Sequence, residues 1–135
     1  MKRQLHLFIK IILIATIIII PLSNTVLAND NTIDIVVSPN VLNIESNGGS
    51  ISIHTDFHYV QEADVSMEVN ETPIDNINTF ADNCGNLVVK CSIDTVKTLV
   101  AGSDEAAFIL IINDNGETYI GTDTIAVIQI IPQKT

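Results

Sequence analysis

The sequence predicts an all-β protein, a β-sandwich of about seven short strands with one short helical turn. Three observations lead to this fold class. Several segments alternate apolar and polar residues with a period of two, the apolar residues are largely β-branched, and turn-forming residues recur about every ten positions. Because the chain has no Trp, two Tyr and four Phe, its core must be mainly aliphatic.

The start of the chain has the three parts of a secretory signal peptide. Basic residues precede an apolar run at 11–20, and a small residue, Ala28, ends the segment. The run is about 10 residues long, half of the ~20 that a membrane-spanning helix needs. We therefore expect residues 1–28 to be cleaved off and residues 29–135 to form one exported β-sandwich domain, without membrane association after cleavage.

The first half of this domain contains four predicted strands. The clearest is the segment 51–57, whose alternation predicts that Ile51, Ile53 and Phe57 point into the core. Asn70-Glu71-Thr72 is formally a glycosylation sequon, but Pro73 follows it and we interpret it as a turn. The four predicted strands are 33–37, 41–44, 51–57 and 65–69.

In the second half, residues 76–86 are polar and are predicted to form a loop. Residues 94–100 place apolar side chains three and four positions apart, with Asp94 as a candidate cap, which predicts a short helix. Asn115-Gly116 favours a tight hairpin, and we expect a kink at Gly121. The predicted strands are 87–91, 106–112, 119–120 and 124–131, of which 106–112 is the most prone to aggregation.

The mature domain is strongly acidic, which limits the chemical classes of partner that it can bind. Removal of the signal leaves three lysines against sixteen acidic residues, a net charge of −13. Such a field repels phosphate backbones, so we expect no nucleic-acid binding. Scarce aromatic residues also argue against a stacking platform for sugars or bases. Cations and basic surfaces are compatible partners, although we attribute the acidity mainly to solubility.

The sharpest chemical pattern is His-x-Asp-x-His, which places His54, Asp56 and His58 on one face of an extended strand. Adjacent members would lie ~7 Å apart, but His54 and His58 would lie ~13 Å apart, too far to share one Zn²⁺. A three-ligand metal site would need a bulge in the strand. We favour the alternative, a polar stripe that faces solvent.

Cys84 and Cys91 are the two cysteines of the chain. An oxidising compartment makes a disulfide between them conceivable. A straight strand of seven residues would separate their Cα atoms by ~23 Å, where a bridge allows under ~7 Å, so the chain would have to fold back at Gly85-Asn86. The alternative is that Cys91 is a small buried core residue.

Other candidate sites have simpler interpretations. The stretches 82–83 and 113–117 offer oxygen ligands suitable for Ca²⁺, but the full twelve-residue calcium loop is missing and turn chemistry accounts for both. For nucleophilic catalysis only His54 and His58 could serve as the base, and no Gly-x-Ser-x-Gly motif accompanies them. We expect no catalytic activity and no cofactor.

The C-terminal half resembles a known family. Gly85-Asn86-Leu87-Val88-Val89-Lys90-Cys91, the helical segment 94–100 and the closing 115–128, with its Gly121-Thr122-Asp123-Thr124-Ile125, are similar to secreted bacterial and archaeal immunoglobulin-like β-sandwich modules. Ser38-Pro39-Asn40 fits the early part of that pattern. Cys91 departs from it, because an aromatic is usual there, and so does the reduced acidic loop at 82–86, which weakens a calcium site.

The resemblance implies an immunoglobulin-like fold and a structural or accessory role. Together with the signal peptide and the absent catalytic motifs, it leads us to expect a secreted, non-catalytic protein at the cell surface, in the periplasm or outside the cell. Its expected partners are other extracellular or cell-surface proteins. The alternative function is a metal- or small-ligand-binding module that uses His54, Asp56 and His58 or the acidic loops.

Overall fold

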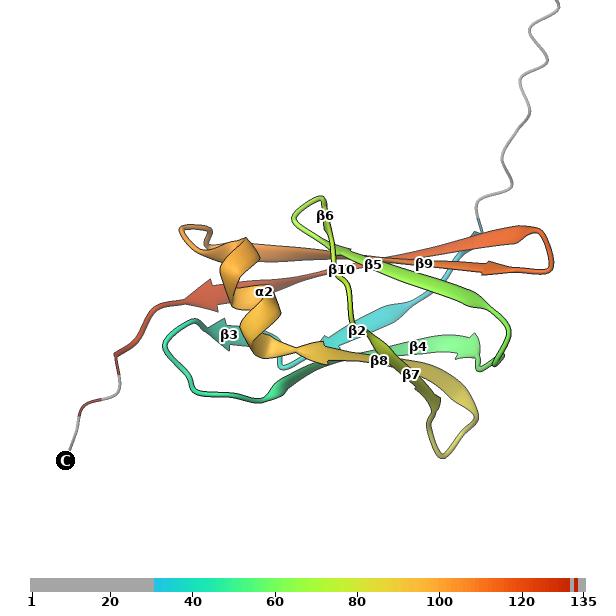
Figure 1. Cartoon of the computed structure of the whole chain (residues 1–135), viewed down its shortest axis with the longest axis horizontal. Coiled ribbons are helices and arrows are strands. Elements are labelled where there is room, and N and C mark those ends of the chain that lie inside the picture. Colours follow the sequence, from blue (N-terminus) through green and yellow to red (C-terminus); the bar gives the residue numbers. More distant parts are fainter. Residues whose placement is uncertain (1–30, 132, 134–135) are drawn as a thin grey trace, which may run out of the picture.

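The computed structural model describes residues 31–131 and 133 (Figure 1). The predicted signal peptide and its cleavage site lie outside the described residues. Within these described residues, one short helix and ten strands follow one another: β1 Asn31–Thr32, β2 Ile35–Ser38, β3 Val41–Asn43, β4 Ser50–His58, β5 Asp64–Val69, β6 Thr72–Pro73, β7 Asn78–Ala81, β8 Asn86–Ser92, α2 Ile93–Val100, β9 Glu105–Asp114 and β10 Glu117–Ile128.

The strands form two sheets packed face to face, which confirms the predicted all-β sandwich (Figure 1). One sheet has the order β1-β10-β9-β5-β6, with β3 also paired to β10, and the other has the order β2-β4-β8-β7. We call the second the four-stranded sheet. Strand β9, which contains the segment predicted to aggregate, lies between β10 and β5 rather than at an edge.

The core is built from the inward-facing residues of both sheets. Ile51 and Ile53 are fully buried, and Phe57 is half-buried against them, as the alternation of this segment predicted. Phe108 from β9 is the largest fully buried side chain. Most of the other core side chains are aliphatic, as the composition required.

The predicted helix is present, but its cap differs. Helix α2 starts at Ile93, and the side chain of Ser92 accepts a hydrogen bond from the backbone N–H of Asp94. Asp94 therefore lies in the first turn, where its charge favours the positive end of the helix, and Ser92 is the N-cap. Val96 and Val100 are fully buried, so the helix closes one end of the sandwich.

Strand β7 is the largest difference from the sequence prediction, which placed a loop there. All four of its residues are exposed, because β7 pairs with β8 at the margin of the sandwich. A strand without an inward apolar face lacks the period-two pattern that would reveal it. Its position in the sheet is decided by pairing with β8, which the local sequence does not encode.

Strand β10 runs through Gly121 without the expected kink. A Cβ atom built on Gly121 would lie 2.4 Å from Cγ2 of Ile35 and 3.0 Å from Cγ1 of Ile33. The glycine is therefore needed for close approach rather than for bending. It lets the segment between β1 and β2 cross directly over β10 into the other sheet.

Asp123 joins the two sheets beside this crossing. Its carboxylate accepts a hydrogen bond of 2.8 Å from the backbone N–H of Val37 in β2 and one of 2.9 Å from the N–H of Thr124. The first bond satisfies a donor on the free edge of β2. The Gly121-Thr122-Asp123-Thr124 stretch thus has a structural role, with one residue allowing the crossing and another fastening it.

Both turns predicted between strands are present. Asn115 and Gly116 have positive φ angles of 50° and 80° and connect β9 to β10 in a tight hairpin. Asn70 and Glu71 have φ angles of 48° and 66° and connect β5 to β6. Among the residues that the structure describes, no helix is long and apolar enough to cross a membrane.

Candidate interaction surface

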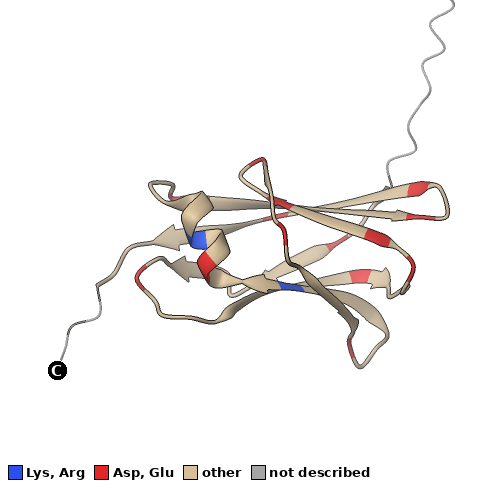
Figure 2. Ribbon diagram, viewed as in Figure 1, with Lys and Arg blue, Asp and Glu red and all other residues tan. Residues whose placement is uncertain are grey.

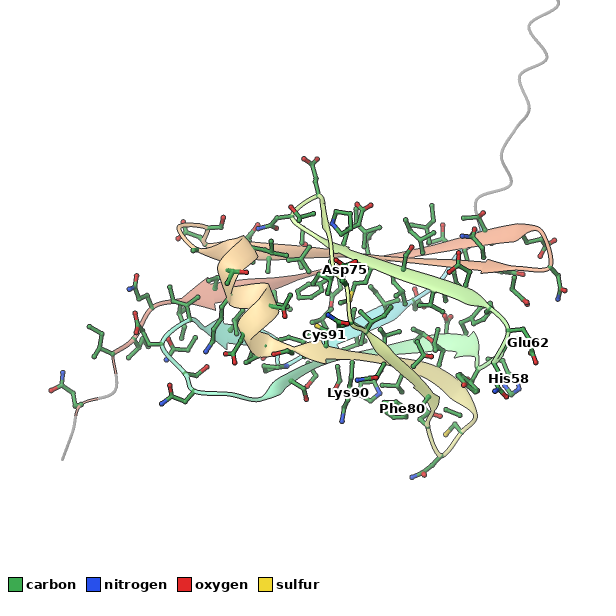
Figure 3. All side chains as sticks on the ribbon, viewed as in Figure 1. His58, Glu62, Asp75, Phe80, Lys90 and Cys91 are labelled. Atoms are coloured by element: carbon green, nitrogen blue, oxygen red, sulfur yellow. The ribbon has the colours of Figure 1, made fainter. Side chains whose placement is uncertain are left out.

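The structure does not bring the three candidate metal ligands together. His54, Asp56 and His58 are all exposed on β4, and among residues 31–131 no group of three metal-capable side chains converges. The Asp56 carboxylate accepts a hydrogen bond from the Asp34 backbone N–H at 3.0 Å. His58 lies against the turn before β8, 3.1 Å from the position of a Cβ on Gly85 (Figure 3).

Strand β4 does contain a bulge of the kind that a three-ligand metal site would have needed, but the side chain of Thr55 occupies it. Its pairing with β8 shifts between His54 and His58. The buried Thr55 hydroxyl fills the gap, because it donates to the Leu87 carbonyl at 2.9 Å and accepts from the Phe57 N–H at 3.2 Å. The bulge is therefore satisfied internally and does not gather the histidines.

Of the two alternatives for the cysteines, the structure has no disulfide, and both cysteines are free. Cys84 is exposed in the turn between β7 and β8, whereas Cys91 is buried opposite Ile51 near the far end of β8 (Figure 3). The strand from Asn86 to Cys91 alone spans about 17 Å, so the turn does not bring the sulfur atoms together. Burial raises the pKa of the Cys91 thiol to about 11, which fits the alternative of a core residue.

The acidic turn at 82–86 is organised by its own backbone. The Asp82 carboxylate accepts hydrogen bonds from the N–H groups of Asn86 at 2.9 Å and Cys84 at 2.8 Å. The bond from Asn86 is the main reason that the pKa of Asp82 is lowered. Since this carboxylate is already engaged by backbone donors, turn chemistry rather than a calcium ligand explains it.

The formal sequon is likewise a structural turn. The Asn70 side chain accepts a 2.9 Å hydrogen bond from the Ala107 N–H, and its amide nitrogen lies 3.4 Å from the Glu105 carbonyl. An open hollow beside this turn is lined by these residues and by Ser103 and Asp104.

The outer face of the four-stranded sheet carries a feature that the sequence did not reveal. Val36, His54, Val88 and Phe80 lie in register across β2, β4, β8 and β7. We call this row the apolar strip. Val36 is 62 % exposed and Phe80 40 % exposed, while Val88 between them is only 1 % exposed.

The next row of the same face contains small or basic residues. Ser38, Ser52, Lys90 and Asn78 lie in register beside the strip. The ammonium of Lys90 lies 5.6 Å from the centre of the Phe80 ring, a cation–π contact on the outer side of the sheet (Figure 3). These two rows hold no acidic residue.

Acidic residues occupy the surfaces around this face (Figure 2). On the outer face of the other sheet, Asp64, Glu68 and Glu105 alternate with inward-facing residues. Asp56, hydrogen-bonded to the Asp34 backbone, lies at the margin of the four-stranded sheet. The apolar strip is therefore an uncharged patch on a strongly acidic molecule.

One sequence signal could have found this strip. Phe80 is one of four phenylalanines in the chain and stands alone in a polar stretch. An isolated large aromatic in such surroundings has no local core to join. The register that brings Val36 and Val88 beside it depends on strand pairing and was not predictable from spacing.

Comparison with known proteins adds no assignment, since no family model and no curated protein matches this chain.

Proposed function

We propose that the mature chain is a secreted, non-catalytic β-sandwich that works through surface contacts with other extracellular or cell-surface proteins. The observation that carries the proposal is the apolar strip on the outer face of the four-stranded sheet. An outward sheet face is normally polar, whereas here Val36 and Phe80 expose large apolar side chains at the two ends of one row, and exposed apolar surface marks interaction sites. The resemblance to secreted immunoglobulin-like modules supports the same role.

Energetics favour the ends of the strip as contact points. Val36 and Phe80 are 62 % and 40 % exposed. Burying the remainder of each would contribute on the order of 1 kcal/mol. Val88 lies beneath and between them, so the strip is rigid and little side-chain entropy is lost on contact.

Charge favours the same face. Fifteen acidic residues between positions 31 and 131 surround it, whereas Lys90 is its charged member and His54 can become so. A partner can cover these two rows of the face without burying a carboxylate, because Asp56 lies beyond them on β4. The acidic surroundings would exclude acidic competitors and maintain solubility.

Site-specific photo-crosslinking in cells that produce the protein tests this proposal. A benzoylphenylalanine replaces Val36, and a matched control replaces Thr122, which is exposed on the other sheet. We expect covalent adducts with surface or secreted proteins from position 36 and few from position 122. Equal labelling at both positions would overturn the assignment of this face.

The non-catalytic part of the proposal has its own test. The secreted chain, identified by an N-terminus at Asn29, is assayed against a panel of hydrolase substrates. We expect no turnover. Turnover that is lost in the His54→Ala variant, while the variant keeps its melting temperature, would refute this part.

A further inference from the structure

The edges of the two sheets are closed to different degrees. The edge of β10 is covered by β1 and β3, and the edge of β2 is fastened by Asp123. Strand β5 is covered from Met67 onward by β6 and Ile74, and its uncovered start carries Asp64. Strand β7 pairs with β8 on one side, and in the described part of the chain no strand pairs with its other side.

The direction of the β7 backbone groups follows from its neighbours. The Leu87 carbonyl points toward β4, since it accepts the Thr55 hydroxyl. Successive residues of a strand alternate in direction, so Val88 and Lys90 bond to Phe80 and Asn78. The N–H and C=O groups of Thr79 and Ala81 therefore point outward from the edge.

The edge strand is short, which limits pairing, but it lacks the other usual protection against contact with another chain. Natural edge strands carry charges, prolines or bulges that prevent contact with another chain. The residues of β7 are Asn, Thr, Phe and Ala, all exposed and without charge. Such an edge is a template for a further antiparallel strand.

We propose that β7 pairs with β7 of a second copy of this chain, antiparallel about a two-fold axis at Phe80. In this register Thr79 of one copy exchanges backbone hydrogen bonds with Ala81 of the other, and the reverse, which uses all four outward groups of each pair. The two Phe80 residues become a non-hydrogen-bonded pair, the closest side-chain arrangement in an antiparallel sheet. The result is one continuous eight-stranded sheet.

This register suits the charges near the edge. Asp82, the acid next to β7, comes opposite Asn78 of the second copy rather than opposite another acid. The apolar strips of the two copies join end to end through Phe80 and double in length. The dimer rests on the proposed function, because it makes the same outer face larger.

Net charge makes the pairing salt-dependent. Each mature chain carries −13, so the two copies repel at long range. Raising salt from about 0.05 M to about 0.5 M shortens the screening length severalfold and removes most of this repulsion. Association of two copies should strengthen with salt, whereas association with a basic partner would weaken.

Sedimentation equilibrium of the mature chain tests the dimer. We expect a monomer–dimer equilibrium that strengthens with salt, and a Thr79→Pro variant that associates at least about tenfold more weakly. Proline at position 79 removes an outward N–H and leaves the bonds to β8 in place. A single monomeric species up to about 1 mM in high salt would overturn the proposal.

A second pair of variants distinguishes loss of the dimer contact from loss of the fold. Thr79→Lys places a charge at the seam, and Thr122→Lys places the same charge on the exposed face of the other sheet. Both variants should keep the wild-type melting temperature. We expect Thr79→Lys alone to weaken association, and equal effects of the two lysines would contradict the model.

Cross-linking tests the register. In a Cys84→Ser background, Phe80→Cys places two thiols opposite each other with Cα atoms about 4.5 Å apart, within the range of a disulfide. Oxidised glutathione should convert this variant to a covalent dimer, while Val36→Cys in the same background stays monomeric. Equal cross-linking at both positions would refute the register.

The outcomes separate this inference from the proposed function. Adducts from position 36 with a chain that stays monomeric would remove the dimer and leave the proposed function intact. A dimer without adducts to other proteins from position 36 would refute the wider interaction role and leave the β7 pairing. A chain that stays monomeric and also gives no adducts from position 36 would remove both proposals.

Discussion

Replacing Gly121 with alanine should destabilise the sandwich through one contact. The new Cβ atom would lie 2.4 Å from Cγ2 of Ile35, about 1 Å inside ordinary contact, and 3.2 Å from the carbonyl oxygen of Ile33. Ile35 is only 8 % exposed and is held between the sheets. Overpacking of this kind costs about 1–3 kcal/mol, which corresponds to a fall in melting temperature of about 10 °C for a domain of this size.

The measurement is urea unfolding followed by far-ultraviolet circular dichroism, because the chain has no Trp for fluorescence. A double-mutant cycle identifies the cause. In an Ile35→Ala background the offending methyl group is gone, so Gly121→Ala should cost at least about 1 kcal/mol less than in the wild type. A loss below about 0.5 kcal/mol in the wild type, or the same loss in both backgrounds, would refute close approach as the role of this glycine.

Three further predictions concern the thiols, the acidic turn and one strained residue. At pH 8, Ellman's reagent should modify Cys84 rapidly and Cys91 only after unfolding, because burial raises the Cys91 pKa to about 11; rapid reaction of two thiols would contradict the packing. The pKa of Asp82 is lowered by backbone hydrogen bonds, so its stabilisation of the turn is present above its ordinary pKa of about 4 and is lost as the pH falls through the lower, folded-state pKa. Amide shifts of the turn, recorded by nuclear magnetic resonance from pH 6 downward, should show this step, and Asp82→Asn should abolish it. Glu71 has a φ angle of 66°, so Glu71→Gly should raise stability by up to about 1 kcal/mol, whereas Glu62→Gly, in a turn without positive φ, should not; unchanged thermal melts for Glu71→Gly would argue against strain there.

Sequence patterns predicted the parts of the fold that bury one face. The segment 51–57 shows period-two alternation because Ile51 and Ile53 face the core while polar residues alternate with them. Asn115-Gly116 was readable as a hairpin because that turn needs positive φ at both positions. In these places local sequence and global fold require the same residues.

The remaining features depend on pairing between distant segments. Strand β7 has no buried face, so its sequence resembles a loop. The helix cap moved from Asp94 to Ser92 because β8 extends to Ser92 and fixes where the helix begins. The apolar strip exists only when four strands align. The positions of Val36, Phe80 and Val88 in the sequence give no sign of that alignment.

The histidine pattern shows why spacing alone is a weak guide to a site. His54, Asp56 and His58 have metal-binding chemistry, and the bulge that could have gathered them is present. Thr55 occupies that bulge with two hydrogen bonds of its own. The same alternation that suggested a metal face exposes all three side chains to solvent, with His54 in the row of the apolar strip.

The central claim is that the edge of β2 is closed by Asp123 and the edge of β7 is open. Amide hydrogen exchange of the dilute mature chain measures the protection of the N–H groups at both edges. Exchange of the Val37 N–H, held by Asp123, should be slow. Along β7, Asn78 and Phe80 should exchange slowly and Thr79 and Ala81 rapidly, an alternation that disappears at high protein concentration. Uniform protection along β7 at low concentration, or rapid exchange at Val37, would contradict the account.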